Sequence, residues 1–302
     1  MSELSPSTAP RRLGQTGPMV SPMAWGMWRF AGDDLAAATA RVEAALEAGI
    51  NFFDTADIYG GRAGFGAAET LLGRVLAASP ALCGKMVLAT KGGIQPGVPY
   101  NSSTDYLVDA CEASLKRLGV EQVELYQIHR PDSLAHPAEV AAAFDKLRTA
   151  GKIAEAGVSN YTPAQVAALA AHMPFSLAST QPEFSPLAIG PVSDGVLDQA
   201  MQLGMSVMAW SPLGGGRLGA QGSADQRVIS LTDTLDQLAH KHGVASASIV
   251  YAWIMAHPSR PIPIVGSQNP DRIRASAEAL GVQLSRAEWY SILTVSRGAP
   301  LP

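Results

Sequence analysis

Short apolar stretches alternate with longer stretches of helical spacing from about residue 20 to the end of the chain. A brief apolar run fits a buried strand, whereas apolar residues recurring every three or four positions fit a helix. The pattern therefore predicts eight strands, each followed by at least one helix. The expected strands cover residues 20–26, 50–54, 86–91, 124–129, 153–158, 177–181, 205–210 and 262–265.

The expected helices cover residues 35–48, 67–78, 103–118, 137–150, 163–171, 193–203, 231–242, 246–257, 270–280 and 285–296. Pro137 at a first helical position and Gly151 just past an end support one pair of boundaries. Gly14, Gly17 and Pro18 predict a small hairpin over residues 11–20. Residues 1–10 have no such pattern and are expected to form a flexible tail.

Strand–helix alternation is typical of a parallel sheet, because each helix is the crossover between two strands. Eight such units in a chain of 302 residues predict an α/β fold, a closed (β/α)₈ TIM barrel. An open, doubly wound sheet is the alternative. No linker divides the chain, so residues 11–302 are expected to form a single domain, with the hairpin at its start and extra helices at its end.

Composition narrows the class of protein. Hydrophobic residues make up 47% and charged residues 16%, which excludes a disordered chain, and a net charge of -4 without a basic run argues against nucleic acid as a partner. Cys83 and Cys111 lack the spacing of a disulfide scaffold or zinc site, so no metal is expected. No signal peptide or apolar run of about 20 residues is present. We expect a soluble, cytoplasmic protein, a monomer or weak homo-oligomer without membrane association.

Ionisable residues stand where three neighbouring strands end. Asp54 ends the second strand, and Tyr59 lies on the loop beyond it. Lys91 ends the third strand and His129 the fourth. Each has a structural explanation when taken alone, such as a turn cap, a rim lysine or a core histidine. Since functional groups of a barrel gather at the carboxyl ends of its strands, the four together favour a catalytic site.

The chemistry of these groups fits proton transfer to a carbonyl oxygen. A phenol has an ordinary pKa of about 10, and a nearby ammonium lowers it. Lys91 is expected to lower the pKa of Tyr59 in this way, and Asp54 to hold Lys91 protonated. His129 is expected to donate a hydrogen bond to the carbonyl oxygen and orient the substrate.

Five segments resemble signatures of the aldo-keto reductases: FDTADIYG over 53–60, ATK over 89–91, YQIHR over 126–130, GVSNY over 157–161 and WSPL over 210–213. The resemblance covers nearly the whole chain from about residue 12, and within the family it is strongest to bacterial oxidoreductases of the YdhF type. It implies NADPH-dependent, reversible reduction of aldehydes or ketones. The hydride would come from the nicotinamide and the proton from Tyr59.

The resemblance also implies the binding residues. Ser159, Asn160 and Gln181 would bind the carboxamide, whose two polar ends their groups can satisfy, and Trp210 would stack on the nicotinamide ring. Further implied cofactor contacts are Gly26, Met27, Asp54, Ser211, Pro212, Leu213, Gly266, Ser267, Gln268, Arg272 and Ser276. Trp28 and Tyr100 are expected to wall the substrate pocket with Tyr59 and His129, although rim packing is an equal alternative for Tyr100.

The loop GGGRLG over 214–219 spells G-x-G-x-x-G. A Rossmann site is not expected, because the residues that follow do not open a helix. One alternative is a bare backbone around Gly215 that approaches a pyrophosphate, with Arg217 as a cationic clamp. The other is a plain flexible loop.

The segment VGSQNPDR over 265–272 precedes a helix, whose free amides would attract phosphate. Ser267 and Arg272 match family positions that hold the 2′-phosphate of NADP. Some family members have a lysine where this chain has Gly266, and many have an asparagine where it has Ser276. Asp271 adds negative charge next to the expected site. These departures weaken the implied preference for NADPH, so NADH remains an alternative cofactor.

Two other functions compete with a carbonyl reductase. A nucleotide-binding sensor or regulatory subunit of the same fold would turn over little, but the intact set of four ionisable groups argues against it. A Schiff-base enzyme using Lys91 is disfavoured, because a lysine beside an acid stays protonated and is a poor nucleophile.

Overall fold

The computed structural model describes residues 3–4, 8–219 and 224–301. Eight parallel strands close into a barrel, in the order β10-β11-β4-β5-β6-β7-β8-β9. Their bounds are β4 Ala24–Gly26, β5 Phe52–Asp54, β6 Val87–Gly92, β7 Val123–Ile128, β8 Ile153–Ser159, β9 Ser179–Gln181, β10 Ser206–Ala209 and β11 Ile262–Val265. The predicted (β/α)₈ barrel is confirmed, and the open sheet is excluded, because β11 pairs with β4.

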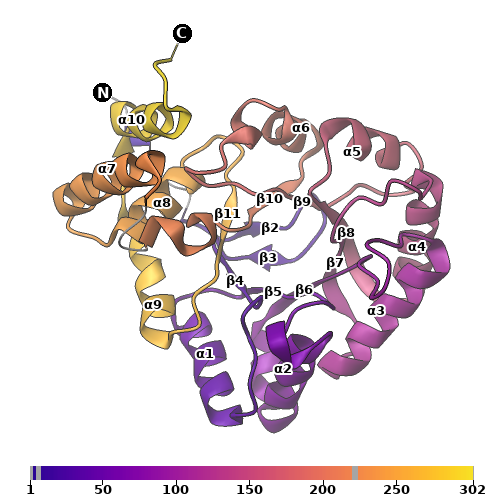
Figure 1. Cartoon of the computed structure of the whole chain (residues 1–302). Helices are drawn as coiled ribbons and strands as arrows, with labels where there is room; N and C mark the ends of the chain where they lie inside the picture. Colours follow the sequence, from indigo (N-terminus) through magenta and orange to yellow (C-terminus); the bar gives the residue numbers. More distant parts are fainter. Residues whose placement is uncertain (1–2, 5–7, 220–223, 302) are drawn as a thin grey trace.

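Helices surround the barrel (Figure 1). They are α1 Leu35–Glu47, α2 Ala67–Ala78, α3 Thr104–Leu118, α4 Pro137–Thr149, α5 Pro163–Ala170, α6 Val196–Leu203, α7 Gln226–His242, α8 Ser246–Met255, α9 Pro270–Ala275 and α10 Arg286–Arg297. The extra helices expected near the C-terminus are present as α7 and α10, which lie together at one side of the ring. In the described part of the chain, no helix has both the length and the apolar character that a membrane crossing requires.

The alternation of side chains along each strand separates two apolar layers. Val87 and Ala89 of β6 face the barrel interior, whereas Leu88 packs outward against the helices. The interior cluster consists of Leu13, Val20, Ala24, Phe52, Val87, Ala89, Leu125, Ala178, Met208, Ile262 and Ile264. The same alternation brings Lys91, two residues beyond Ala89, into the interior at the carboxyl end of β6.

The predicted N-terminal hairpin is confirmed as β2 Arg11–Arg12 paired antiparallel with β3 Met19–Val20. Leu13 and Val20 of this hairpin join the interior cluster, so the hairpin covers one end of the barrel. The tail expected over residues 1–10 includes 1–2 and 5–7, which lie outside the described residues. Within that stretch, β1 Glu3–Leu4 pairs antiparallel with β12 Leu284–Ser285.

Several expected boundaries are wrong by a few residues. The helix expected from residue 231 begins at Gln226, where the Asp225 side chain accepts from the Arg227 amide. The helix expected over 270–280 is α only as far as Ala275 and continues as a 3₁₀ helix, Ser276–Gly281. There the Ser276 hydroxyl donates to the Ile273 carbonyl at 2.6 Å, a bond that competes with the α-helical ladder.

Candidate active site

A buried lysine lies at the centre of the site. Lys91 Nζ donates to Asp54 Oδ2 at 2.7 Å, to the Thr55 carbonyl at 2.8 Å and to Tyr59 Oη at 3.2 Å. The Lys91 side chain is fully buried. The second Asp54 oxygen accepts from Gln181 Nε2 at 3.0 Å. The structure therefore brings together an acid, an ammonium and a phenol that arise from three neighbouring elements.

The electrostatics of this group follow from burial and charge. Burial alone would lower the pKa of Lys91, but Asp54 and Tyr59 outweigh it, and the pKa is raised. Burial raises the pKa of Tyr59, and the opposing effect of Lys91 is smaller. Lys91 thus lowers the pKa of Tyr59, as expected, but burial outweighs this effect and the pKa as a whole is raised. Tyr59 is a neutral phenol beside a permanent cation, which is the state of a proton donor.

His129 faces the same phenol. Its ring centroid is 5.5 Å from that of Tyr59, in an edge-on arrangement. Burial, followed by the charges of Lys91 and Arg130, lowers the pKa of His129 well below its ordinary value. The imidazole is neutral and keeps one N–H donor. Its Nδ1 is buried without a hydrogen-bond partner among the described residues.

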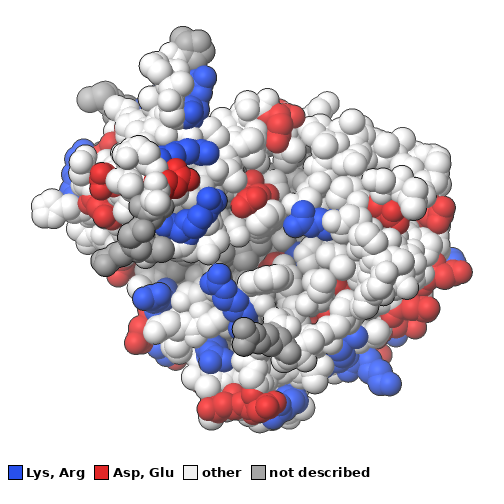
Figure 2. Space-filling view, viewed as in Figure 1, with Lys and Arg blue, Asp and Glu red and all other residues white. Residues whose placement is uncertain are grey.

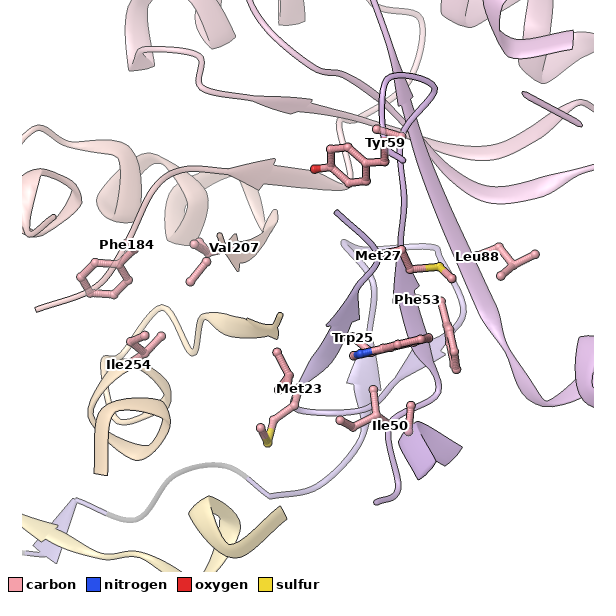
Figure 3. Close-up of a cluster of buried hydrophobic side chains, with 14 of the residues drawn as sticks. Met23, Trp25, Met27, Ile50, Phe53, Tyr59, Leu88, Phe184, Val207 and Ile254 are labelled. Carbon is pink, nitrogen blue, oxygen red and sulfur yellow. The ribbon is translucent and has the colours of Figure 1, made fainter. Parts of the chain in front are cut away.

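Aromatic side chains border the Tyr59 ring. Figure 3 shows Tyr59 above Met27, with its oxygen directed away from Phe53 and Leu88. The ring of Trp28 lies edge-on to Tyr59, at 5.5 Å between centroids, and is 59% exposed. Trp28 therefore offers an open apolar face beside the hydroxyl. Tyr100 is exposed as well, and among the described residues its ring does not contact the ring of Tyr59 or His129.

The residues expected to bind the nicotinamide form one network at the ends of β8, β9 and β10. Asn160 Nδ2 donates to Ser159 Oγ at 2.9 Å, and Trp210 Nε1 donates to Asn160 Oδ1 at 3.0 Å. Asn160 and Ser211 have φ angles of 61° and 49°. Non-glycine residues at positive φ are uncommon and gather at functional sites, so these two strand ends hold a costly conformation at the expected cofactor position.

The glycine-rich loop has room at its backbone. A Cβ added to Gly215 or Gly216 would meet no atom within 4 Å, and their φ angles are 71° and 97°. Such a bare surface suits the close approach of a ligand. Arg217 is exposed, and its Nε donates to the Gly214 carbonyl at 3.0 Å within the same loop. Pro212 is buried beside the loop, and Leu213 is half-buried.

In the segment after β11, two backbone amides that were expected to be free already donate hydrogen bonds. Asn269 caps α9, and its Oδ1 accepts from the amides of Asp271 and Arg272 at 2.9 and 3.1 Å. The expectation that these two amides are free for a phosphate is therefore wrong, because the Asn269 side chain already accepts from both of them. The Arg272 side chain is exposed and has no partner among the described residues. Gly266 faces open space, and Ser276 is buried on the Ile273 carbonyl.

Gly26 and Met27 lie at the end of β4. Met27 is fully buried, and its amide donates to the Asp54 carbonyl at 2.9 Å. A Cβ at Gly26 would lie 2.6 Å from Ile264 Cγ2, so strand packing explains this glycine. Gln268 Nε2 donates to the Gly26 carbonyl at 3.3 Å, which joins the segment after β11 to the first strand of the barrel.

Comparison with known proteins decides the family. The Aldo/keto reductase family model matches residues 22–296. The chain belongs to this family. It is an oxidoreductase that reduces carbonyl compounds, and aldo-keto reductases use nicotinamide cofactors.

Several relatives are similar to this aldo-keto reductase along nearly its whole length. A 6-dehydroglucose reductase of Novosphingobium aromaticivorans is 53% identical, with 100% of both chains covered. Oxidoreductase YdhF of Escherichia coli is 37% identical, with 96% of this chain and 98% of YdhF covered. A 6-dehydroglucose reductase of Agrobacterium fabrum is 36% identical, with 92% of this chain and 95% of that protein covered. The resemblance to YdhF-type oxidoreductases is confirmed.

Sequence reasoning missed a second polar group of this reductase, on the outer side of β6. Glu69 is fully buried; it accepts from Thr90 Oγ1 at 2.5 Å and pairs with Arg117 Nε at 2.7 Å. Asp57 is also fully buried, and neither of its carboxyl oxygens has a partner among the described residues. Burial, with Glu69 next, raises the pKa of Asp57 to about 8. Nothing in the DTAD motif distinguishes its two acids, because spacing does not reveal burial.

Arg130, the last residue of the YQIHR segment, lies close to the expected site. Its guanidinium carbon lies 5.9 Å from the centroid of the Trp210 ring. Its charge acts on both Tyr59 and His129. Arg130 therefore stands at the mouth of the barrel, beside both the expected cofactor platform and the proton donor.

Proposed function

We propose that the protein is an NADPH-dependent aldehyde reductase in which Tyr59 donates the proton. The observation that carries this proposal is the position of Lys91 Nζ, 2.7 Å from Asp54 and 3.2 Å from Tyr59 at the carboxyl ends of the strands. A bound reduced nicotinamide supplies the hydride. Ser159, Asn160 and Gln181 would hold its carboxamide, and Trp210 would lie against its ring.

Tyr59 and Lys91 would have different roles in proton transfer. As the carbonyl carbon gains a hydride, its oxygen becomes a strong base and takes the proton from Tyr59 Oη. The ammonium of Lys91 stabilises the phenolate that remains, and such positioned acids contribute about 10²–10⁴-fold to rate. Asp54 keeps Lys91 charged and in place. The raised pKa of Lys91 also argues against a Schiff base, since a protonated amine is not a nucleophile.

His129 would fix the carbonyl oxygen. As a neutral imidazole it donates one hydrogen bond without competing for the proton of Tyr59. The two rings are edge-on neighbours, with their centroids 5.5 Å apart. A carbonyl oxygen bound there would accept a hydrogen bond from each.

For the substrate we propose 6-dehydroglucose, in which C6 of glucose is an aldehyde. The analogy is with two relatives that are named 6-dehydroglucose reductase. The site supports a sugar in two ways. Trp28 offers an exposed aromatic face next to Tyr59, on which the apolar face of a pyranose can pack. Arg130 brings hydrogen-bond donors for hydroxyl groups to the same mouth. Reduction of the aldehyde would release glucose.

The test is NADPH oxidation with 6-dehydroglucose, methylglyoxal and benzaldehyde, in the parent and in Tyr59→Phe. We expect the highest kcat/KM with 6-dehydroglucose, and a loss of kcat of about 10²–10⁴-fold in the variant. The NADP⁺ dissociation constant should stay unchanged, because Tyr59 Oη is assigned to the substrate. Equal rates in parent and variant would remove the proton-donor role. NADP⁺ binding without turnover of any aldehyde would instead support the sensor alternative.

A further inference from the structure

We infer that Arg41 of α1 is a second cation for the 2′-phosphate of NADP, acting together with Arg272. This inference rests on the proposed function and deepens it, because it assigns a residue that discriminates NADP from NAD. Neither the sequence motifs nor the family match points to α1. Arg41 of α1 contacts the segment 266–269, which follows β11.

That segment is fixed by residues distant in sequence. Trp25 Nε1 donates to the Ser267 carbonyl at 2.9 Å, and Arg41 Nε donates to the Gln268 carbonyl at 3.1 Å. α1 packs along α9, as Figure 1 shows. The half-buried Arg41 side chain thus reaches from α1 to the loop that carries Ser267 and leads to Arg272.

Only some of the N–H donors of the Arg41 guanidinium form hydrogen bonds. A guanidinium carries five N–H donors in a planar fork, and the bond to Gln268 uses the one on Nε. The two terminal nitrogens of Arg41 have no partner among the residues that the structure describes. The geometry of a guanidinium matches two oxygens of a phosphate. Because the Nε bond already orients the Arg41 side chain, phosphate binding would cost little side-chain conformational entropy.

The backbone amides at the start of α9 are already paired, so a phosphate bound there would depend on side chains. The amides of Asp271 and Arg272 already donate to Asn269, and the Ser267 hydroxyl accepts from the Asn269 amide at 3.2 Å. The exposed side chain of Arg272 has no partner among the residues that the structure describes. A doubly charged phosphate beside Ser267 therefore needs cations, and Arg41, bound to the carbonyl of the adjacent Gln268, would supply one.

The third arginine nearby is already neutralised. Arg274 Nε pairs with Glu47 at 2.6 Å, and its Nη1 pairs with Asp271 at 3.3 Å. Arg274 thus offsets Glu47 and Asp271, and within the described part of the chain neither Arg41 nor Arg272 pairs with a carboxylate. Figure 2 shows basic side chains over α9 and α1 and between them, on a molecule whose net charge is -4.

The experiment compares Arg41→Met with the parent by calorimetric titration of NADP⁺, NAD⁺, 2′,5′-ADP and 5′-AMP. Methionine keeps much of the unbranched stem and removes the charge. We expect NADP⁺ and 2′,5′-ADP to bind about tenfold more weakly, the effect of one lost charge-assisted bond, and the two ligands without a 2′-phosphate to change less than about twofold. Arg148→Met on α4, where Arg148 stacks on Phe175 at 4.2 Å, is the control for net charge.

A rescue variant tests the same point by adding a cation at another position of the segment 266–269. A Cβ at Gly266 meets no atom within 4 Å, so Gly266→Lys places its first side-chain carbon in open space. In the Arg41→Met background it should restore most of the lost NADP⁺ affinity. Equal weakening of NADP⁺ and NAD⁺ would overturn the inference, because Arg41 would then only fix the Gln268 carbonyl. Unchanged NADP⁺ affinity in Arg41→Met, with aldehyde reduction intact, would overturn it too while leaving the proposed function in place.

Discussion

At the scale of single residues, the unexpected feature is a buried acid next to the catalytic group. Asp57 lies three residues after Asp54, and its amide donates to the Lys91 carbonyl at 3.0 Å. With a pKa raised to about 8 by burial and by Glu69, Asp57 carries a proton at neutral pH. Lys91 is therefore paired with one carboxylate, Asp54, rather than two, and the surroundings of Tyr59 gain no second negative charge.

This protonation has a consequence for stability. In the unfolded chain, the Asp57 carboxyl would ionise above about pH 4. In the folded protein it stays protonated until the pH approaches its raised pKa of about 8. Because the folded state binds one more proton in that window, Asp57 makes stability fall as pH rises from about 4 to 8, by roughly 1.4 kcal/mol per pH unit at most.

Asp57→Asn removes the titration and keeps the shape. We expect the variant to gain stability relative to the parent as pH rises through that window, with the two converging near pH 4. Urea unfolding at a series of pH values measures the difference. A constant gap between the two proteins at all pH values would show that Asp57 is ionised in the fold.

Single residues also mark the limit of prediction from sequence. Asp54, Tyr59, Lys91 and His129 stood out because each ends a strand or directly follows one. Asp57 and Arg41 did not. Burial decides the protonation of Asp57, and the packing of α1 against α9 decides the reach of Arg41. Both are tertiary properties that no local spacing encodes.

At the scale of elements, the strands were predicted well because their pattern is simple. A period of two directs alternate residues inward, so an ionisable residue two positions after a buried interior residue enters the barrel mouth. Helix ends were predicted less well. The start of α7 depends on the Asp225 cap, and the end of α9 on a Ser276 side-chain bond. Both are single hydrogen bonds that compete with continuation of the helix.

One carboxylate joins three of these elements. Glu288 in the first turn of α10 accepts from Lys241 of α7 at 2.6 Å and from the Ser285 amide at 2.7 Å. It also lies 3.1 Å from His242 Nε2. Burial alone would raise the pKa of Glu288, but the hydrogen bonds from Lys241 and Ser285 lower it to about 2. The ionised carboxylate is thus part of the folded state.

Glu288→Gln should therefore destabilise the protein in a pH-dependent way. Because the folded pKa is lowered, the stabilisation is complete above the unfolded value of about 4.3 and is lost as pH falls towards 2. We expect a loss of about 1 kcal/mol near neutral pH, since Lys241 is largely exposed, and a smaller loss near pH 3. Guanidinium unfolding at both pH values measures it, and an equal loss at both would assign the effect to packing.

At the scale of the whole molecule, the first and last strands of the barrel meet beside the expected cofactor. β11 pairs with β4 through Ile264 and Ala24, and Trp25 of β4 holds the Ser267 carbonyl. The proposed dinucleotide would contact loops that follow β4, β8, β10 and β11. These loops come from both ends of the sequence, so a bound dinucleotide would link the two ends of the chain across the closure of the barrel.

NADP⁺ is therefore expected to stabilise the entire fold rather than one loop. A ligand that binds only the folded state adds about 2.7 kcal/mol at a concentration one hundred times its dissociation constant. Thermal unfolding with and without NADP⁺ should show a single transition that moves upward. At the same NADP⁺ concentration Arg41→Met should gain about 1.4 kcal/mol less, because its affinity is tenfold lower. A transition that splits in two would show instead that the cofactor stabilises only part of the barrel.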